Sequence, residues 1–365
     1  MHIDRLVLNN FRNYQALDVR FTENVNVFYG SNAQGKTNVL EGIYIGAMGK
    51  SFKRAFDKDL VRFGENAASV GIGFHSGQIE MTNKIEIYTD KKRKIYCDGV
   101  EIKTRAEMLG RLGVVLFTPE DMGFVKDGPD KRRKFLDFSI SQLRKSYLFA
   151  FYHYQKTLEQ KSKLLKSDCI DKAVLEAYND KLSQYSSVLY YYRGSFLKTL
   201  EYILLPIYHR LSSKKETLKI FYKKSIKHDS GLDKKEIQDI VCAQYQQCMA
   251  EEIAQRACLY GPHRDDLIFY IGGKNVRNFG SQGQQRSLVL TLKLALMEIF
   301  QDQTGEYPIL LLDDVASELD KHRRDFLLDY IRDKQVFITC TDKNMIDLKQ
   351  DIAFYKIETG SIGKG

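Results

Sequence analysis

Eight consecutive residues match the pattern G-x-x-x-x-G-K-[ST] of a phosphate-binding loop at every fixed position. They are Gly30, Ser31, Asn32, Ala33, Gln34, Gly35, Lys36 and Thr37. The glycines let the backbone curl so that several N–H groups point at one anion, and a helix starting there adds partial positive charge. Lys36 can reach the β- and γ-phosphates of a nucleoside triphosphate, and the Thr37 hydroxyl can bind Mg²⁺. The loop therefore predicts a site for a triphosphate with its magnesium ion.

A second candidate site lies where an apolar run ends in two carboxylates. The run Ile309–Leu312 predicts a buried strand, and Asp313 and Asp314 follow it directly. A buried strand holds Asp313 rigidly, so that this residue can orient the ligands of Mg²⁺. Asp314 can polarise an attacking water as a general base. The alternative is an ordinary strand followed by an exposed acidic turn, but the presence of the phosphate-binding loop favours the metal site.

A third candidate lies in the segment Phe279–Arg286, which precedes the apolar helical pattern of Gln285–Phe300. Ser281, Gln282 and Gly283 form a small, hydroxyl-bearing turn at the expected start of that helix. Because a helix start presents unpaired N–H groups, the turn is a candidate anion site.

The elements that position these residues indicate an α/β fold. Val25–Tyr29 is a short β-rich run that ends at the first glycine of the loop, and a helix is expected from about Gly35 to Met48. Tyr307–Leu312 and Gln335–Thr339 are continuous apolar runs typical of buried strands. The loop and the acidic pair therefore belong to strands of one buried sheet.

Three alternating segments, Ala68–Phe74, Ile79–Tyr88 and Lys94–Cys97, are separated by turn residues and predict an antiparallel β-layer. From about Lys131 to Tyr260 the apolar pattern becomes helical. A compact P-loop kinase or GTPase does not need so long a segment between its loop and its acidic strand. We therefore expect three parts: an N-terminal half at 1–120, a helical insertion at 121–260 and a C-terminal half at 261–365.

The excess positive charge is concentrated in that insertion. The chain of 365 residues has a formal net charge of +9, and residues 121–260 contain 25 Lys and Arg against 17 Asp and Glu. The same segment holds 13 of the 22 tyrosines. Positive charge mixed with aromatic residues suits a surface that follows nucleic-acid phosphates. A solvated helical face with core tyrosines is the alternative, and charge runs alone favour it. Within the segment, Arg132 and Lys134 are candidate DNA contacts.

Other classes of protein are disfavoured by composition. The six cysteines are scattered without a CxxC pair, which argues against a disulfide framework or a zinc ribbon. The longest apolar stretches, such as Tyr202–Tyr208, are far shorter than a membrane-spanning helix. The first residues show no basic-then-apolar leader. We expect a cytoplasmic protein with reduced thiols and no membrane partner.

The order of these features resembles that of the SMC/ABC-type ATPases: phosphate-binding loop, large helical insertion, Ser-Gln-Gly-Gln-Gln turn, then an Asp-Asp strand end. The turn is similar to their signature motif, with Gln282 where a glycine is more usual. Ser317-Glu318-Leu319-Asp320 is similar to their dimer-contacting loop. The resemblance implies an ATPase head with an antiparallel β-layer and an inserted helical arm.

Four motifs in this order resemble the RecF family, the short-armed SMC-like ATPases of bacterial DNA gap repair. They are Asn10–Tyr14, Gly30–Asn38, Gly261–Asp266 and the Ser281–Arg286 turn. The resemblance runs from Met1 to about Thr341.

The RecF resemblance implies a role for each site residue. Arg12 would lie by the nucleotide phosphates, and Asn38 completes the loop motif. Lys36, Thr37 and Asp313 would hold ATP and Mg²⁺. Ser281 and Gly283 of one subunit would cap the γ-phosphate held by the other.

The same resemblance implies partners and a pathway. RecF-like proteins form a homodimer on ATP, bind duplex and gapped DNA near single-strand junctions, and help to load RecA together with RecR and RecO. It also implies a link to recombination, replication maintenance and the SOS response to DNA damage, with weak ATPase activity.

The sequence departs from the wider pattern at three places. The base position holds Asp314 instead of the glutamate common in ABC ATPases, and this shorter carboxylate predicts slow turnover. Cys340-Thr341 stands where many relatives have a switch histidine. A Q-loop glutamine has no clear counterpart, and Phe117–Asp121 is its expected region.

Alternatives remain at this point. His263-Arg264-Asp265 has the first letters of a kinase catalytic loop, but Tyr270 occupies the place of the required asparagine, so that kinase function is rejected. The motif instead predicts a structural ion-pair turn or a nucleotide-linked dimer contact. The leading hypothesis is a clamp in which ATP binding closes a dimer on DNA and hydrolysis releases it. A DNA-binding scaffold whose nucleotide sets dimerisation with negligible hydrolysis is the second hypothesis. Another SMC-like ATPase is the third.

Overall fold

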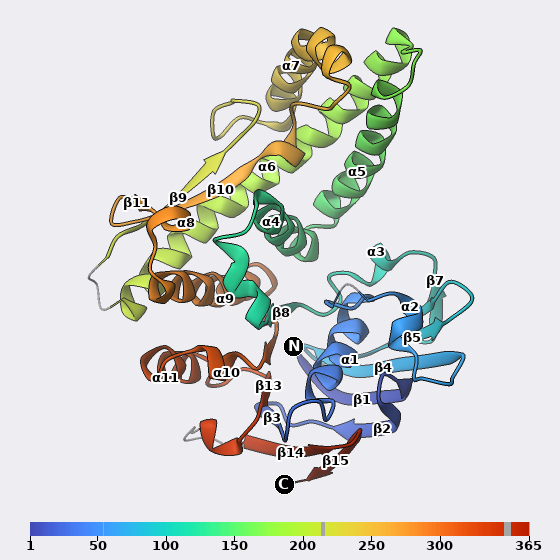
Figure 1. Ribbon diagram of the computed structural model, residues 1–365, viewed down its shortest axis with the longest axis vertical. Coiled ribbons are helices and arrows are strands. Elements are labelled where there is room, and N and C mark those ends of the chain that lie inside the picture. Colours follow the sequence, from blue (N-terminus) through green and yellow to red (C-terminus); the bar gives the residue numbers. More distant parts are fainter. Residues whose placement is uncertain (54, 213–215, 347–351, 365) are drawn as a thin grey trace. The chain divides into compact units, whose positions relative to one another are not determined.

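A six-stranded sheet carries the phosphate-binding loop in the computed structural model, which describes residues 1–53, 55–212, 216–346 and 352–364. The strand order is β15-β14-β3-β13-β12-β8, and all neighbours are parallel except the β14–β15 pair (Figure 1). The strands are β3 (Val25–Tyr29), β8 (Val114–Phe117), β12 (Ile309–Asp313), β13 (Val336–Cys340), β14 (Ile352–Glu358) and β15 (Ser361–Lys364). Every residue of β12 and β13 is buried, as continuous apolar runs in a parallel sheet require.

An antiparallel sheet forms the predicted β-layer. Its order is β2-β1-β4-β5-β6-β7. The strands are β1 (His2–Phe11), β2 (Tyr14–Arg20), β4 (Ala67–Ser76), β5 (Ile79–Tyr88), β6 (Lys94–Cys97) and β7 (Val100–Ile102). Helix α1 (Lys36–Met48) packs closely on this sheet, because a Cβ on Gly42 would meet Leu8 at 2.9 Å and one on Gly46 would meet Ile72 at 2.5 Å. The β-layer and the second half of α1 are thereby closely packed.

The chain divides into two compact units, Met1–Met122 with Val289–Gly365, and Gly123–Leu288. Both sheets described above belong to the first unit. Its shorter helices are α2 (Asp57–Leu60), α3 (Arg105–Met108), η1 (Pro119–Phe124, which reaches the boundary), α10 (Val315–Glu318), α11 (Lys321–Tyr330) and η3 (Lys343–Met345).

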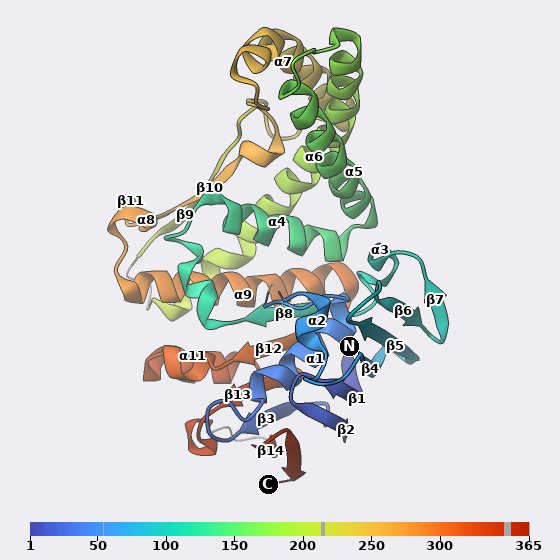
Figure 2. The same cartoon turned by 45° about the vertical axis from the view of Figure 1, so that its right-hand side comes forward.

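The second unit is mainly helical. In Figure 2, α5 and α7 lie beside the 40-residue helix α6. Its elements are α4 (Pro129–Leu143), α5 (Lys145–Leu165), α6 (Lys172–Leu211), β9 (Leu218–Lys223), α7 (Lys234–Gln255), η2 (Pro262–Arg264), β10 (Asp266–Ile271), β11 (Lys274–Asn275) and α8 (Val276–Phe279). Helix α9 (Gln282–Thr304) begins in this unit, and the division between units falls within it.

The α/β fold class with an antiparallel layer and helical insertion is confirmed. One element inside the insertion was missed: β9 lies where helix alone was expected, and it pairs with β10 of the hairpin that follows the insertion. The second unit extends to Leu288, beyond the predicted end of the insertion at residue 260. The three-part division at 120 and 260 stays a prediction. None of the helices in the described ranges has the length and apolar character needed to cross a bilayer.

A buried ion pair joins two helices of the second unit. Lys161 on α5 and Glu252 on α7 are both inaccessible to solvent, and the Lys161 ammonium donates to Glu252 Oε2 over 2.5 Å. The other carboxylate oxygen accepts from the Leu259 backbone N–H at 2.8 Å. The Lys161 ammonium also makes a cation–π contact with Tyr245, 4.8 Å from the centre of its ring. Buried charges persist when each has such partners.

We predict that Lys161→Met lowers the free energy of unfolding of this unit by about 3–5 kcal/mol, because Glu252 stays buried without its cation. Adding Glu252→Gln should recover most of that loss, since the amide oxygen still accepts from Leu259. Urea unfolding followed by circular dichroism measures both variants. A single variant as stable as the unmodified protein would contradict the assignment.

Candidate functional site

The phosphate-binding loop has the backbone shape that its glycines permit. Gly30 and Gly35 have φ of 147° and 112°, and Ala33 between them has φ of 64°. A Cβ on Gly30 would lie 2.5 Å from the Ile357 carbonyl oxygen. The loop therefore curls tightly between β3 and α1, with its N–H groups gathered at the helix start.

Residues distant in sequence brace the loop. The Asn13 amide donates to the Gln34 carbonyl at 3.0 Å, and the Tyr14 hydroxyl donates to the Gly35 carbonyl at 3.1 Å. The side chain of Asn38 donates to Asn13 Oδ1 at 2.9 Å. From the other side, the Thr359 N–H donates to Gln34 Oε1 at 2.7 Å. The first strand pair and the β14–β15 turn thus hold the loop in one conformation.

Lys36 folds back over the loop. Its ammonium donates to the carbonyl oxygens of Gly30 at 2.6 Å and Ser31 at 2.8 Å. Burial lowers the pKa of Lys36, while Asp314 and Asp313 oppose that shift. A partly desolvated cation in a loop of gathered N–H groups is suited to receive a phosphate.

Thr37, Asp313 and Thr339 meet at one carboxylate oxygen. The Thr37 hydroxyl donates to Asp313 Oδ1 at 2.9 Å, and the Thr339 hydroxyl donates to the same atom at 2.8 Å. The sheet order explains the meeting, because β13 lies between β3 and β12 and brings Thr339 between the loop and the acidic strand end. The two predicted metal-binding residues are therefore neighbours.

The donor set fits Mg²⁺. Burial raises the pKa of Asp313, although the hydrogen bonds from Thr339 and Thr37 lower it in part. A buried carboxylate with this raised pKa gains from a nearby cation, and a carboxylate with a hydroxyl supplies the hard oxygen ligands that Mg²⁺ prefers.

Asp314 follows in a left-handed conformation with φ of 51°. Its backbone N–H donates to Thr339 Oγ1 at 2.8 Å. Thr339 therefore bonds to both acidic residues at once.

The positions that depart from the family pattern lie close by in the fold. Cys340 is fully buried at the end of β13, and burial raises the pKa of its thiol to about 11. It is therefore a neutral packing group, while Thr341 beside it is exposed. The region Phe117–Asp121 follows β8 next to β12, and its Asp121 pairs with Lys293 at 3.0 Å.

The guanidinium of Arg12 is hydrogen-bonded to a carboxylate in this structure. It makes two hydrogen bonds to the buried Glu41 on α1, at 3.0 and 2.8 Å, and a third to the Asp59 carbonyl. Its predicted phosphate contact stays a prediction. The neighbouring Asn13 and Tyr14 are the residues of this motif whose side chains bond to the loop.

The signature-like turn lies in the second unit. Ser281 precedes α9, and Gln282 and Gly283 form its first turn. A Cβ on Gly280 would meet Val276 at 2.6 Å, so that the chain enters the turn along a tight path. These residues and the phosphate-binding loop belong to different units.

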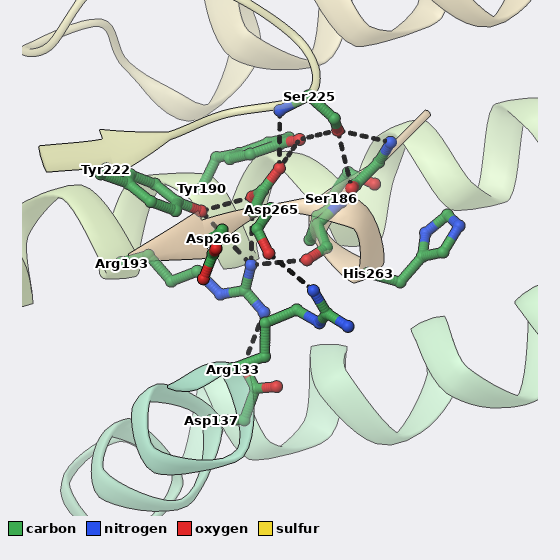
Figure 3. Close-up of polar contacts among 12 residues, drawn as sticks. Arg133, Asp137, Ser186, Tyr190, Arg193, Tyr222, Ser225, His263, Asp265 and Asp266 are labelled. Carbon is green, nitrogen blue, oxygen red and sulfur yellow. Dashed lines mark hydrogen bonds and ion pairs between the residues drawn. The ribbon is translucent and has the colours of Figure 1, made fainter. Parts of the chain in front are cut away.

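The Gly261–Asp266 motif builds a buried ionic network (Figure 3). Arg193 on α6 is the largest fully buried side chain of the described residues. It bonds to Asp137 at 2.7 Å, Asp265 at 3.2 Å and the Pro262 carbonyl at 2.9 Å. Burial alone would lower the pKa of Arg193, but the charges of Asp137 and Asp265 hold it above its ordinary value.

The same network explains His263 as a structural residue. Burial lowers the pKa of His263 to about 4, so that its ring is neutral when it bonds to the Tyr154 hydroxyl at 2.6 Å. Asp265 is satisfied by the Ser225 N–H at 2.8 Å and by Tyr222 at 2.5 Å. An ion-pair turn therefore accounts for the motif, and no catalytic base is needed.

One candidate DNA contact was wrong. Arg132 is buried, and its guanidinium bonds to both carboxylate oxygens of Asp266, at 2.7 and 3.0 Å. Within the basic run Lys131–Lys134, Arg132 therefore lies in the core. Lys134 is the exposed one of the two candidate DNA contacts.

Sequence reasoning missed Asn13, Tyr14 and Thr339 as site residues. Asn13 and Tyr14 lay within a motif already singled out, and Thr339 ended the run Gln335–Thr339 that was predicted to be a buried strand. Their contacts depend on which strands are neighbours, and spacing within one segment does not reveal that order.

Comparison with known proteins agrees with this geometry. Residues 2–361 match the model of the RecF/RecN/SMC N terminal domain family. A curated relative, the DNA replication and repair protein RecF of Clostridium tetani, is 39% identical over 363 residues, covering 99% of each chain. The solved structure of the recombination mediator protein RecF-ATPrS in the RecFOR pathway aligns with a TM-score of 0.92 at 33% identity, over 100% of this chain and 98% of that one.

An SMC head bound to the C-winged helix domain of ScpA aligns with a TM-score of 0.58 at 15% identity, which shows a shared fold. The full-length identity to the curated relative and the match to the RecF structure narrow the family assignment from SMC heads in general to RecF. This chain belongs to the RecF family of SMC/ABC-type ATPases.

Proposed function

We propose that this protein is an ATP-dependent DNA-binding protein of recombinational DNA repair and replication maintenance. ATP binding closes a homodimer on duplex DNA near single-strand junctions, and weak hydrolysis releases it. The observation that carries the proposal is the shared hydrogen-bonded oxygen of Asp313, which joins Thr37 of the loop to the acidic strand end. The names of the relatives, a DNA replication and repair protein and a recombination mediator of the RecFOR pathway, support it.

The first unit binds the nucleotide in this proposal. Lys36 exchanges its bonds to the Gly30 and Ser31 carbonyls for the phosphates, and the curled backbone of the loop supplies N–H donors. Thr37 and Asp313 hold Mg²⁺, which when bound neutralises charge on the phosphates. Asp314 accepts a proton from the attacking water.

The second unit completes the site of a partner copy. Ser281, Gln282 and Gly283 donate to the γ-phosphate held by the other subunit, so that ATP joins two chains through charge-assisted hydrogen bonds. RecR, RecO and RecA are the protein partners that family membership suggests, and the cytoplasm is the expected compartment.

The edge strand β9 offers a DNA surface. Lys219, Phe221 and Lys223 alternate along its exposed face, and the side chain of Phe221 is 53% exposed. Lysines on either side of an exposed aromatic ring suit phosphate and sugar contacts.

We predict that Lys36→Arg abolishes ATP-dependent dimerisation and leaves the fold intact. The bulkier guanidinium does not fit the buried position of the ammonium, which is 7% exposed. Sedimentation with and without ATP measures dimerisation, and circular dichroism checks the fold. An unaltered ATP response would count against the nucleotide site.

We predict that Asp314→Asn slows hydrolysis by about 10²-fold or more and prolongs the life of the ATP-bound dimer on DNA, because the proton acceptor is lost while the fold of the turn is kept. Single-turnover phosphate release and dimer dissociation measure the two effects. An unchanged dimer lifetime would favour the scaffold with negligible hydrolysis.

We predict that duplex binding weakens with salt and strengthens with ATP. Lys219→Gln with Lys223→Gln should reduce the slope of log K against log[salt] by about 1–2, as two phosphate contacts are lost. The matched control, Lys163→Gln with Lys166→Gln, removes the same charge from exposed positions at the end of α5. Equal effects of both pairs would show that β9 is not a specific contact surface.

A further inference from the structure

The signature-like turn is closed by a reciprocal pair of hydrogen bonds. The Ser281 N–H donates to Gln284 Oε1 at 2.9 Å, and the Gln284 N–H donates to Ser281 Oγ at 3.2 Å. This is a capping box at the start of α9. Ser281 Oγ accepts one bond in this box and keeps its own proton for donation to another acceptor.

Gln284 also connects the turn to a distant part of the second unit. Its Nε2 donates to Glu216 Oε1 at 2.6 Å. The other oxygen of Glu216 accepts from the hydroxyl of Tyr208 at 2.7 Å. Tyr208 is fully buried near the end of α6. One carboxylate therefore joins the longest helix of the unit to the turn.

The chemistry of Glu216 decides which way the Gln284 amide faces. The two ends of a carboxamide have nearly the same shape, and one donates while the other accepts. An ionised carboxylate only accepts, so it holds the NH₂ end of Gln284 toward itself. The carbonyl end then faces the Ser281 N–H. In the reversed orientation the Gln284 NH₂ would face the Ser281 N–H, which places two donors together. The Gln284 carbonyl oxygen would then face the Glu216 carboxylate, which places two acceptors together.

Neighbouring bonds fix the rest of the turn without Glu216. The Gln285 side chain donates to the Gly280 carbonyl at 2.9 Å, and the Gly280 N–H donates to the Val276 carbonyl at 3.0 Å. The contribution of Glu216 is thus confined to the orientation of Gln284 and, through it, of Ser281.

We propose that Glu216 is a positioning residue for the signature-like turn: it orients the Gln284 amide, which caps Ser281 and directs the Ser281 hydroxyl toward the nucleotide of a partner copy. The last step rests on the function proposed above. The link also means that a displacement at the end of α6 is transmitted to Ser281 through three hydrogen bonds, Tyr208–Glu216, Glu216–Gln284 and Gln284–Ser281. Glu216 touches no nucleotide itself.

Three variants test this inference. Glu216→Leu removes both acceptors. Glu216→Gln keeps an oxygen for Gln284, and the Tyr208 hydroxyl can turn to accept from the new amide. The control is Glu251→Leu, which breaks a similar Glu–Gln pair: the exposed Glu251 accepts from Gln255 on α7 at 3.1 Å.

The first readout needs neither ATP nor a dimer. Hydrogen exchange of the Ser281 amide, followed by mass spectrometry of the 276–288 segment, should accelerate about fivefold or more in Glu216→Leu, because its capping acceptor is released. Glu216→Gln and Glu251→Leu should exchange like the unmodified protein. Unchanged exchange in Glu216→Leu overturns the inference, whatever the fate of the dimer.

The second readout is ATP-dependent dimerisation, measured by sedimentation. Glu216→Leu should weaken it about tenfold, since each dimer contains two such turns, while the affinity of the monomer for a fluorescent ATP analogue stays unchanged. Glu216→Gln should restore dimerisation to within about threefold. An unmodified protein that fails to dimerise on ATP refutes the proposed function. A protein that dimerises equally well with and without Glu216 refutes the positioning role.

Discussion

The candidate site depends on one buried carboxylate oxygen. Asp313 Oδ1 accepts from Thr37 at the start of α1 and from Thr339 at the end of β13, so that helix α1 and two strands of the parallel sheet are bonded at one atom. Burial raises the pKa of Asp313, so the ionised form is costly without compensation. The two hydroxyls supply part of that compensation, and a divalent cation would supply more. Binding of a cation and alignment of the loop with the acidic strand therefore depend on the same carboxylate.

The phosphate-binding loop shows the same dependence on distant segments. Its curled backbone needs glycine at Gly30 and Gly35, but glycine also leaves a chain free to adopt many conformations. Asn13, Tyr14 and Thr359 bond to the loop from the two ends of the chain and remove that freedom. Preorganisation of this kind lowers the entropic cost of binding an anion.

Motifs within one segment could be predicted from the sequence. Contacts between residues that lie on neighbouring strands could not. Glycine spacing and an apolar run ending in Asp313 revealed the loop and the acidic strand. Thr339 could not be found in this way, because its role comes from β13 lying between β3 and β12. Arg132 was misjudged because a run of basic residues is ordinarily solvated, whereas Asp266 draws this one into the core. The strand β9 was missed since its sequence, Leu-Lys-Ile-Phe-Tyr-Lys, has no strict polar–apolar alternation, is only six residues long and lies between helices.

The second unit uses its buried charges differently from the first. Around Arg193, every carboxylate is matched by cations, hydroxyls or N–H groups, so that this network joins α4 and α6 to the segment directly before β10. Glu216 extends the bonding from the far end of α6 to Gln284. In the proposed dimer this turn meets the phosphate held by a separate chain, and it gains no rigidity from that partner before the two associate. It has to be oriented in advance by its own unit, and a long helix with a satisfied ionic core is a suitable frame for that purpose.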